Sequence, residues 1–208
     1  MDLVVRNNNL STLPDGICNL TRLTLLDLAK NNVSNLPSGI GRLTSLQRLF
    51  LGRNSLCTLP DTIGKLSGLR KLILKGNNGL RALPESIFKL VHLYELDLSD
   101  CNFSHLPSEI GDLVYLEVLD LGNNGFRSLP ESICKIHRLE DLDLNNCNLS
   151  HLPKLPTRTW VEAKCCPSLE SLPLELDQLG CIANYSGSSK LAENNYLTSL
   201  LKQLPKSK

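Results

Sequence analysis

The hydrophobic positions of this chain recur in one short pattern. Each copy has alternating leucines, then an Asn or Cys, then Leu-Pro, and then an Ile and a Leu three residues apart. One copy runs over residues 23–43 and the next over residues 46–66. The Leu-Pro pairs start at Leu13, Leu36, Leu59, Leu83, Leu106, Leu129, Leu152 and Leu172, at intervals of 23 or 24 residues and finally 20. This regularity predicts a repeat architecture of about eight units.

Each part of the pattern predicts one element of the repeat. Alternation with period 2 predicts a short strand with one buried face. Successive units then stack as parallel strands, and their leucines form one continuous core that no single unit could build. The Pro ends the strand segment, and the Ile and Leu three apart fit a helical or 3₁₀ turn. We therefore expect an α/β solenoid of horseshoe shape, with a parallel concave sheet and short helical or 3₁₀ convex segments.

A polar or small residue occurs at one fixed position between the strand and the Leu-Pro pair. A turn buried at the core needs partners for its backbone groups, and an Asn amide both donates and accepts hydrogen bonds. We expect these residues, here called the ladder, to stack from repeat to repeat with a structural role. The ladder consists of Asn8, Asn31, Asn54, Asn77, Cys101, Asn124, Cys147 and Cys166.

Composition and charge narrow the function classes. Leucine makes up about a fifth of the chain, and aromatic residues only 4%. The net charge is +1, which gives no electrostatic basis for binding nucleic acid or a membrane surface. The sequence has no membrane-spanning apolar stretch, and its first residues do not show the basic and apolar regions of a signal peptide. We expect a cytoplasmic protein, with the nucleus as the alternative, whose eight cysteines are free thiols.

The two ends of the chain depart from the repeat. We expect the repeat domain to span residues 1–179, with a shortened last unit, and a tail over residues 180–208. Leu197, Leu200, Leu201 and Leu204 predict a short amphipathic helix at about 190–204. The first unit begins at Met1 without a polar cap, and such caps normally cover solenoid ends. We therefore expect the chain to be a piece of a longer protein.

The outward positions of the predicted strands are candidates for partner binding, because a solenoid presents them on its concave surface. Their charges separate along the chain. The first group, called the basic patch, comprises Arg48, Phe50, Arg53, Lys71, Ile73 and Lys75. The second group, called the acidic face, comprises Glu95, Asp97, Asp100, Asp120, Asp141, Asp143 and Glu162, and the outward position of Trp160 is a further candidate beside it. Stacked like charges repel, so a basic partner would relieve the acidic face. A simple solvated surface is the alternative, because Leu-Asp-Leu is common in this type of repeat.

Nothing in the sequence favours catalysis. No Ser-His-Asp arrangement, paired-carboxylate site or Gly-rich phosphate loop stands out, and the four histidines occupy variable positions. Cys165, Cys166, Cys181 and His151 do not have the spacing of a familiar zinc site. We expect a non-enzymatic protein with no cofactor and no bound metal.

The repeat text resembles the leucine-rich repeat of the 23-residue intracellular type. Its last part is more specific: L-P-x-L-P at residues 152–156 is followed by A-x-x-C-x-S-L-x-x-L at residues 163–172. This string resembles the end of the repeat domain in plant nucleotide-binding leucine-rich-repeat immune receptors of the TIR class. Residues 184–194 resemble the segment that follows it there. The resemblance implies a sensing module whose protein ligand is a pathogen effector, a guarded host protein or an intramolecular nucleotide-binding domain.

Two alternatives remain open from the sequence. A standalone scaffold resembling Ras-pathway leucine-rich-repeat proteins shares the L-P-x-x-I-G-x-L turn of residues 36–43, but should be capped at its ends. A bacterial ubiquitin ligase with an L-P-x-L-P repeat would need units of about 20 residues throughout and a large catalytic domain. Only the last interval here is 20, and no such domain follows.

Overall fold

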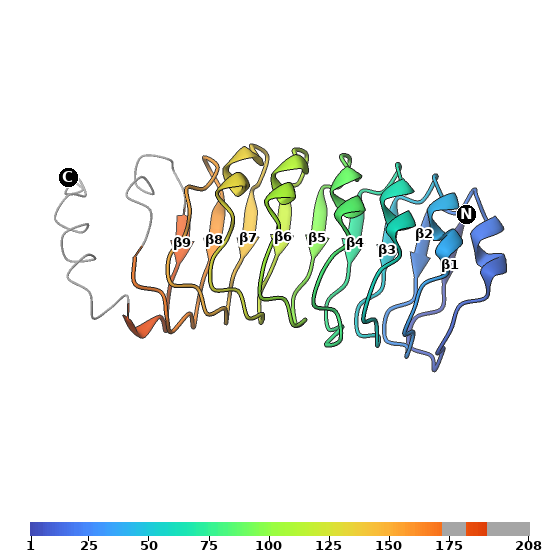
Figure 1. Ribbon diagram of the computed structural model, residues 1–208, viewed down its shortest axis with the longest axis horizontal. Helices are drawn as coiled ribbons and strands as arrows, with labels where there is room; N and C mark the ends of the chain where they lie inside the picture. The colour runs from blue at the N-terminus through green and yellow to red at the C-terminus, as the bar shows by residue number, and fades with distance from the viewer. Residues whose placement is uncertain (172–181, 191–208) are drawn as a thin grey trace.

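The chain forms a row of stacked repeats with its strands side by side (Figure 1). The computed structural model describes residues 1–171 and 182–190. Within these residues, nine short strands make one sheet in chain order, and each pairs in parallel with the next. The strands are β1 (Asp2–Val4), β2 (Leu25–Asp27), β3 (Arg48–Phe50), β4 (Lys71–Ile73), β5 (Glu95–Asp97), β6 (Val118–Asp120), β7 (Asp141–Asp143), β8 (Trp160–Glu162) and β9 (Ile182–Asn184).

The register of the strands stacks the leucines as the alternation predicted. The middle residues of β2 and β3, Leu26 and Leu49, lie opposite each other in the sheet. Leu49 in turn lies opposite Leu72 of β4. All three are fully buried. Their neighbours in each strand point to the opposite, solvent-facing side, which we call the concave face. The predicted repeat solenoid with a parallel sheet is therefore confirmed.

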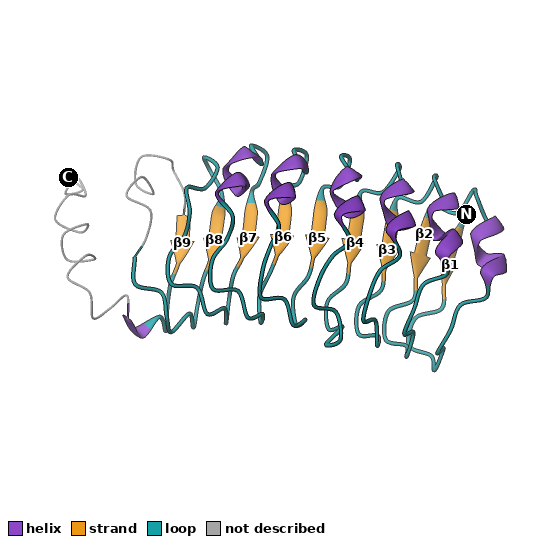
Figure 2. Ribbon diagram, in the orientation of Figure 1, coloured by secondary structure: helices purple, strands orange, loops and turns teal. Residues whose placement is uncertain are grey.

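In the part of the chain that the structure describes, six 3₁₀-helices lie on the other side of the core from the concave face (Figure 2). Each starts directly after the Pro of a Leu-Pro pair, with that Pro in an extended conformation, for example Pro37 at φ −61° and ψ 142°. The Ile of each helix is buried, as at Ile40 and Ile63. The helices are η1 (Asp15–Asn19), η2 (Ser38–Arg42), η3 (Asp61–Lys65), η4 (Glu85–Lys89), η5 (Ser108–Asp112) and η6 (Glu131–Lys135). Between β7 and β8 the buried Pro153, Leu155 and Pro156 take the place of a helix.

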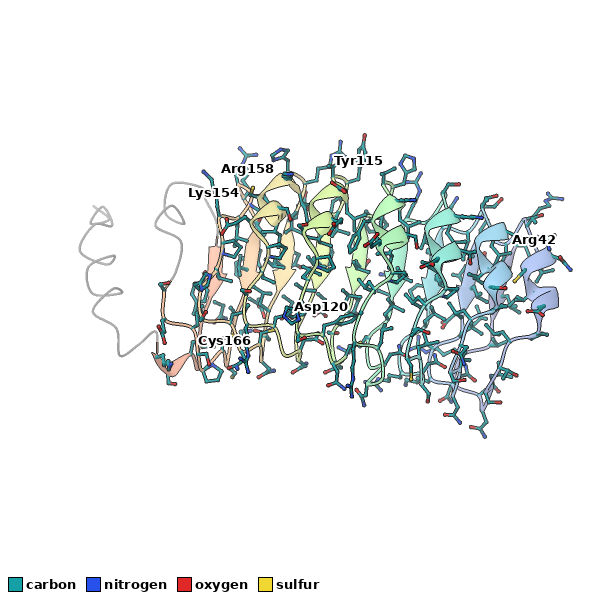
Figure 3. The ribbon with its side chains drawn as sticks, in the orientation of Figure 1. Arg42, Tyr115, Asp120, Lys154, Arg158 and Cys166 are labelled. Atoms are coloured by element: carbon teal, nitrogen blue, oxygen red, sulfur yellow. The ribbon has the colours of Figure 1, made fainter. Side chains whose placement is uncertain are left out.

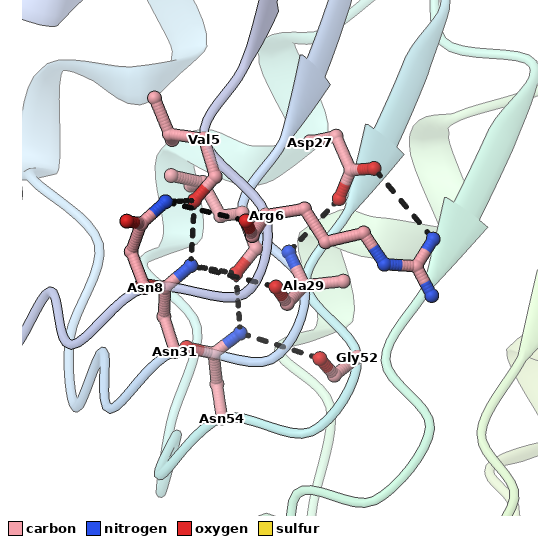
Figure 4. A network of polar contacts seen from close by, with 9 residues as sticks. Val5, Arg6, Asn8, Asp27, Ala29, Asn31, Gly52 and Asn54 are labelled. Carbon is pink, nitrogen blue, oxygen red and sulfur yellow. Dashed lines mark hydrogen bonds and ion pairs between the residues drawn. The ribbon is translucent and has the colours of Figure 1, made fainter.

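Asparagine amides tie neighbouring repeats together along the inside of the turns (Figure 4). The Asn54 Nδ2 donates to Leu51 O of its own turn at 2.9 Å and to Leu28 O of the preceding repeat at 3.0 Å. Its Oδ1 accepts from the Val33 N–H at 3.0 Å. Asn31, Asn77 and Asn124 repeat this arrangement. Each of these amides satisfies backbone groups that would otherwise be buried without partners.

Cysteine thiols make part of the same link where Cys stands in the ladder. The thiols of Cys101, Cys147 and Cys166 donate to carbonyl oxygens of preceding repeats at 3.5, 3.4 and 3.2 Å. Burial raises the pKa of Cys101 to about 11 and that of Cys147 to about 12. These thiols are therefore protonated hydrogen-bond donors rather than reactive thiolates.

The sheet extends beyond residue 179, where we expected the repeats to end, so that boundary was set too early. β9 pairs with β8, and the turn after it has the same features as the earlier turns. Gly187 has φ +78°, as the residues before earlier ladder positions also have positive φ, and the next residue, Ser188, is buried. The Ser188 Oγ donates to Ala163 O at 3.1 Å and accepts from the Cys166 N–H at 3.2 Å. Ser188 thus continues the ladder. The helix expected at 190–204 falls, apart from its first residue, outside the described residues.

Candidate functional site

The concave face carries a hollow over its first four strands, here called the basic groove. Its volume is about 340 Å³. It is lined by Arg6, Ala29, Lys30, Phe50, Gly52, Arg53, Lys71, Ile73 and Lys75. The structure thus brings together five of the six basic-patch residues. Arg48 does not line the hollow, and its exposed side chain starts β3 beside it.

The floor of the basic groove is apolar. Phe50 and Ile73 are partners in adjacent strands and are half-buried, rather than exposed as their outward positions suggested. The Lys71 Nζ lies 5.8 Å from the centre of the Phe50 ring, within the range of a cation–π contact. Arg6 and Lys30, which stand just after β1 and β2, also line the groove and were not among the predicted basic-patch residues.

The basic patch and the acidic face are joined by ion pairs where they meet. Lys71 pairs with Glu95 at 2.5 Å, and Lys75 pairs with Asp100 at 3.3 Å. These pairs neutralise the charge around β4 and β5. Within the described residues, Arg53 forms no ion pair and is exposed. Arg6 pairs with Asp27 at 3.9 Å, so the positive charge without an ion pair in the described residues lies around Lys30, Arg48 and Arg53.

A second hollow, here called the acidic hollow, lies over β6–β8. Its volume is about 230 Å³. It is lined by Val118, Leu119, Asp120, Asp141, Asp143, Trp160 and Glu162. Trp160 is 39% exposed, so its ring stands open to a partner beside carboxylates. Asp120, labelled in Figure 3, lies in the middle of the sheet, between the two ends of the row of strands.

Several acidic-face carboxylates also have a structural role that the sequence analysis missed. Each Asp that ends a strand accepts, through Oδ1, the N–H of the residue two positions later. The distances are 2.9 Å from Ser99 to Asp97, 3.0 Å from Gly122 to Asp120, and 2.7 Å from Asn145 to Asp143. Asp27 does the same and is buried. This contact orients the carboxylates and leaves Oδ2 for a partner or for solvent.

The electrostatics of the acidic hollow are uneven. Burial, together with the charges of Asp97 and Asp143, raises the pKa of Asp120 to about 6 although the Gly122 N–H opposes the shift. Burial, Asp143 and Glu162 also raise the pKa of Asp141. Hydrogen bonds from Asn145 and Lys164 instead lower the pKa of Glu162. A bound cation would favour the charged form of Asp120 and Asp141.

A third hollow, on the flank of the solenoid, was not predicted. Arg70, His92, Tyr94, Tyr115, Glu117 and Arg138 line it. The Arg138 guanidinium lies 4.8 Å from the centre of the Tyr115 ring, and the His92 and Tyr115 rings are 6.1 Å apart. The exposed Tyr115 ring, labelled in Figure 3, therefore already contacts two neighbouring side chains of this surface, Arg138 and His92.

Two further findings concern chemistry and membranes. In residues 1–171 and 182–190, no three His, Cys, Asp or Glu side chains come close enough together to hold a metal ion. Within the same ranges, no helix has the length and apolar character needed to cross a bilayer.

Several solved structures are similar to this chain. A leucine-rich repeat protein of Leptospira interrogans is 32% identical, with a TM-score of 0.84, and the match covers 89% of this chain and 48% of that one. The leucine-rich repeat domain of the type III effector XopL is 27% identical, with a TM-score of 0.82, and the match covers 99% of this chain and 73% of that one. The Arabidopsis receptor kinase HAESA, solved with the peptide hormone IDA and the co-receptor SERK1, is 27% identical, with a TM-score of 0.71. The match covers 88% of this chain and 33% of that one.

The share of each relative that the chain covers and the match to a family model bear on which family the chain belongs to. It spans about half the length of the Leptospira protein and about a third of the receptor kinase. A comparison with curated proteins gave no match. A family model described as a leucine-rich repeat region matches residues 2–79 and 82–158, which together make up most of the chain. With its stacked strands and asparagine ladder, the chain belongs to the leucine-rich repeat family.

Proposed function

We propose that the chain is a non-catalytic protein-recognition module that binds a protein ligand on its concave face. The observation that carries this proposal is the basic groove, in which half-buried Phe50 and Ile73 lie among cationic side chains. Binding energy at protein interfaces concentrates on aromatic and arginine side chains in small hollows. The receptor kinase HAESA, solved with a peptide hormone, is an example of a similar repeat fold in complex with a peptide.

The test uses peptides selected for binding to the chain itself. A random peptide library is panned on the wild-type protein, and the selected peptides are titrated against Phe50→Ala. Val114→Ala is the matched control, because Val114 is exposed and apolar but lies outside the three hollows described above. We expect Phe50→Ala to weaken binding at least tenfold and Val114→Ala to leave it unchanged. Equal binding by both variants would overturn recognition through this face.

A more specific role is also part of the proposal: the effector- or host-protein-sensing repeats of an intracellular plant immune receptor. Its support is the string of residues 152–156 and 163–172, which resembles the end of the repeat domain in TIR-class receptors. In that role the chain works in the cytoplasm or the nucleus, and its ligand is an effector, a guarded host protein or an intramolecular nucleotide-binding domain. It would carry no switch of its own, because the sequence has no G-x-x-x-x-G-K-[ST] motif.

The alternative is a standalone leucine-rich-repeat scaffold, which the L-P-x-x-I-G-x-L turn of residues 36–43 favours. Mapping the 5′ end of the native transcript separates the two roles. A reading frame that continues upstream into a nucleotide-binding motif supports the immune receptor. An in-frame stop just before Met1 supports the scaffold.

A further inference from the structure

The concave face has two hollows of opposite charge on one continuous sheet. The basic groove is centred on β3 and the acidic hollow on β7. The ion pairs Lys71–Glu95 and Lys75–Asp100 join the β4 side of the basic groove to β5 and its turn, and they neutralise these charges. The basic groove and the acidic hollow therefore remain two separate regions of opposite charge.

The two regions differ in chemistry as well as in charge. In the basic groove, Arg53 and Lys30 stand beside an apolar floor, which suits a carboxylate next to a bulky apolar side chain. In the acidic hollow, the exposed Trp160 ring stands beside Asp141 and Asp143. An aromatic face next to carboxylates suits an ammonium or guanidinium group.

The floor between the two hollows is open to a close approach. The second position after the strand is Ser99 at β5 and Gly122 at β6, whereas Lys75 stands at this position after β4 and lines the basic groove. Ser99 and Gly122 are buried and contribute no long side chain to the surface. An extended backbone can therefore cross β5 and β6 without meeting a long side chain at these positions.

The sheet geometry sets the spacing of the two regions. From β3 to β7 there are four strand-to-strand steps of about 4.8 Å, or about 19 Å in all. An extended polypeptide rises about 3.3 Å per residue, so about six residues span this distance.

We infer that the ligand is an extended, dipolar polypeptide segment that crosses the strands, with an acidic-apolar end in the basic groove and a basic end in the acidic hollow about six residues away. This inference rests on the proposed function and specifies its partner. The opposite charges fix the direction in which the segment lies. The spacing selects among segments that carry the same charges.

The experiment uses labelled synthetic peptides and fluorescence anisotropy with the full chain. The main probe joins a block of two glutamates flanking a phenylalanine to a block of three basic residues through a six-residue Gly-Ser spacer. The comparison probes are each block alone and the same two blocks with a two-residue spacer. We expect the main probe to bind at least tenfold more tightly than any comparison probe. Its affinity should also fall as salt is raised.

Charge-reversal variants assign each end of the probe to its hollow. Arg53→Glu should weaken the main probe at least tenfold, and Asp141→Lys should do the same. A probe whose basic block is replaced by an acidic one should recover its affinity with Asp141→Lys. The matched controls Lys135→Glu and Glu131→Lys change exposed charges on η6, on the opposite side, and should have no effect.

The outcomes separate this inference from the proposed function. If the main probe binds no more tightly than the single blocks, or is indifferent to spacer length, the dipolar segment is excluded. Phe50→Ala could still abolish binding of the library-selected peptides in that case. Recognition by the concave face would then stand, with a ligand of different charge pattern.

Discussion

At the scale of single residues, the ladder amides hold adjacent repeats in register. Asn54 is buried, and its amide serves backbone groups of two different repeats. Asn8 stands at the same place in the first repeat, but it is exposed and its amide donates only to carbonyls of its own turn. The asparagine amide thus links two repeats at position 54 but stays within one turn at position 8.

This difference predicts unequal costs for removing the two amides. Asn54→Ala leaves the buried Val33 N–H without a partner, whereas Leu28 O and Leu51 O keep hydrogen bonds from Asn31 and Asn77. The loss should lower the free energy of unfolding by about 1–3 kcal/mol. Asn8→Ala should lower it by less than about 1 kcal/mol, because water can replace the lost bonds. Urea denaturation followed by circular dichroism measures both. Equal losses would show that the ladder acts within turns and not between them.

Asp120 predicts a pH-dependent stability. Burial and the neighbouring Asp97 and Asp143 raise its pKa from 3.8 to about 6 in the folded chain. The folded state therefore binds this proton more tightly than the unfolded state, and Asp120 lowers stability as the pH rises from about 4 to about 6. Above pH 6 the full penalty remains. The shift corresponds to about 3 kcal/mol at most, which solvent screening reduces to about 1 kcal/mol at this partly exposed group.

Asp120→Asn removes that charge and keeps an Oδ1 acceptor for the Gly122 N–H. We expect the variant to match the wild type near pH 4 and to be about 1 kcal/mol more stable at pH 7. Thermal denaturation across this pH range measures the difference. Asp112→Asn, at an exposed position of η5, is the control and should track the wild type throughout. A stability difference that does not change with pH would contradict the titration of Asp120.

At the scale of elements, the convex helices η2, η3 and η5 pack closely against the helix that follows each of them, because a glycine faces that helix. A Cβ on Gly64 would come within 2.2 Å of Ser86 O, a backbone atom of η4, and one on Gly41 within 2.3 Å of Thr62 O in η3. Gly16, in η1, has nothing within 4 Å of its Cβ position. The chain thus contains a close-packed glycine and an open one in equivalent elements.

Gly64→Ala should force η3 and η4 apart and lower the free energy of unfolding by about 1–3 kcal/mol. Gly16→Ala should leave stability unchanged or raise it by up to about 1 kcal/mol, because Ala restricts the unfolded chain. Differential scanning calorimetry of the two variants decides the matter. Similar melting temperatures for both would mean that the spacing of the helices adjusts freely.

The elements also show what the sequence could and could not predict. Strand and helix positions follow from local spacing, since period 2 and the Leu-Pro pair are visible within each repeat. β9 was missed because Ser188 replaces the expected Asn or Cys and only its contacts with Ala163 and Cys166 reveal its role. Lys71 and Glu95 each start one of two adjacent strands, so the repeat spacing alone places them side by side. The repeat spacing does not place Lys75 beside Asp100, because Asp100 lies in a turn whose conformation is set only in the folded chain.

At the scale of the whole molecule, each repeat contacts only its neighbours, so stability passes along the chain through interfaces between adjacent repeats. The core is one continuous cluster of buried residues from Ile17 to Leu169. Leu72, in β4, is fully buried near its centre, whereas Leu3, in β1, is only partly buried. A destabilising substitution in the middle of the stack should therefore reduce the cooperativity of unfolding, whereas one in the first repeat should not.

Leu72→Ala leaves a cavity in the centre of the stack and should lower the free energy of unfolding by about 2–5 kcal/mol. It also weakens the coupling between the repeats on either side. Trp160, the one tryptophan of the chain, lies in β8 and reports on the C-terminal side, while circular dichroism reports on all repeats. We expect the two signals to change together in urea for the wild type and to separate for Leu72→Ala. Leu3→Ala should cost less and keep the two transitions coincident. If Leu72→Ala shifts both signals equally, coupling reaches beyond adjacent repeats and the chain unfolds as a single unit.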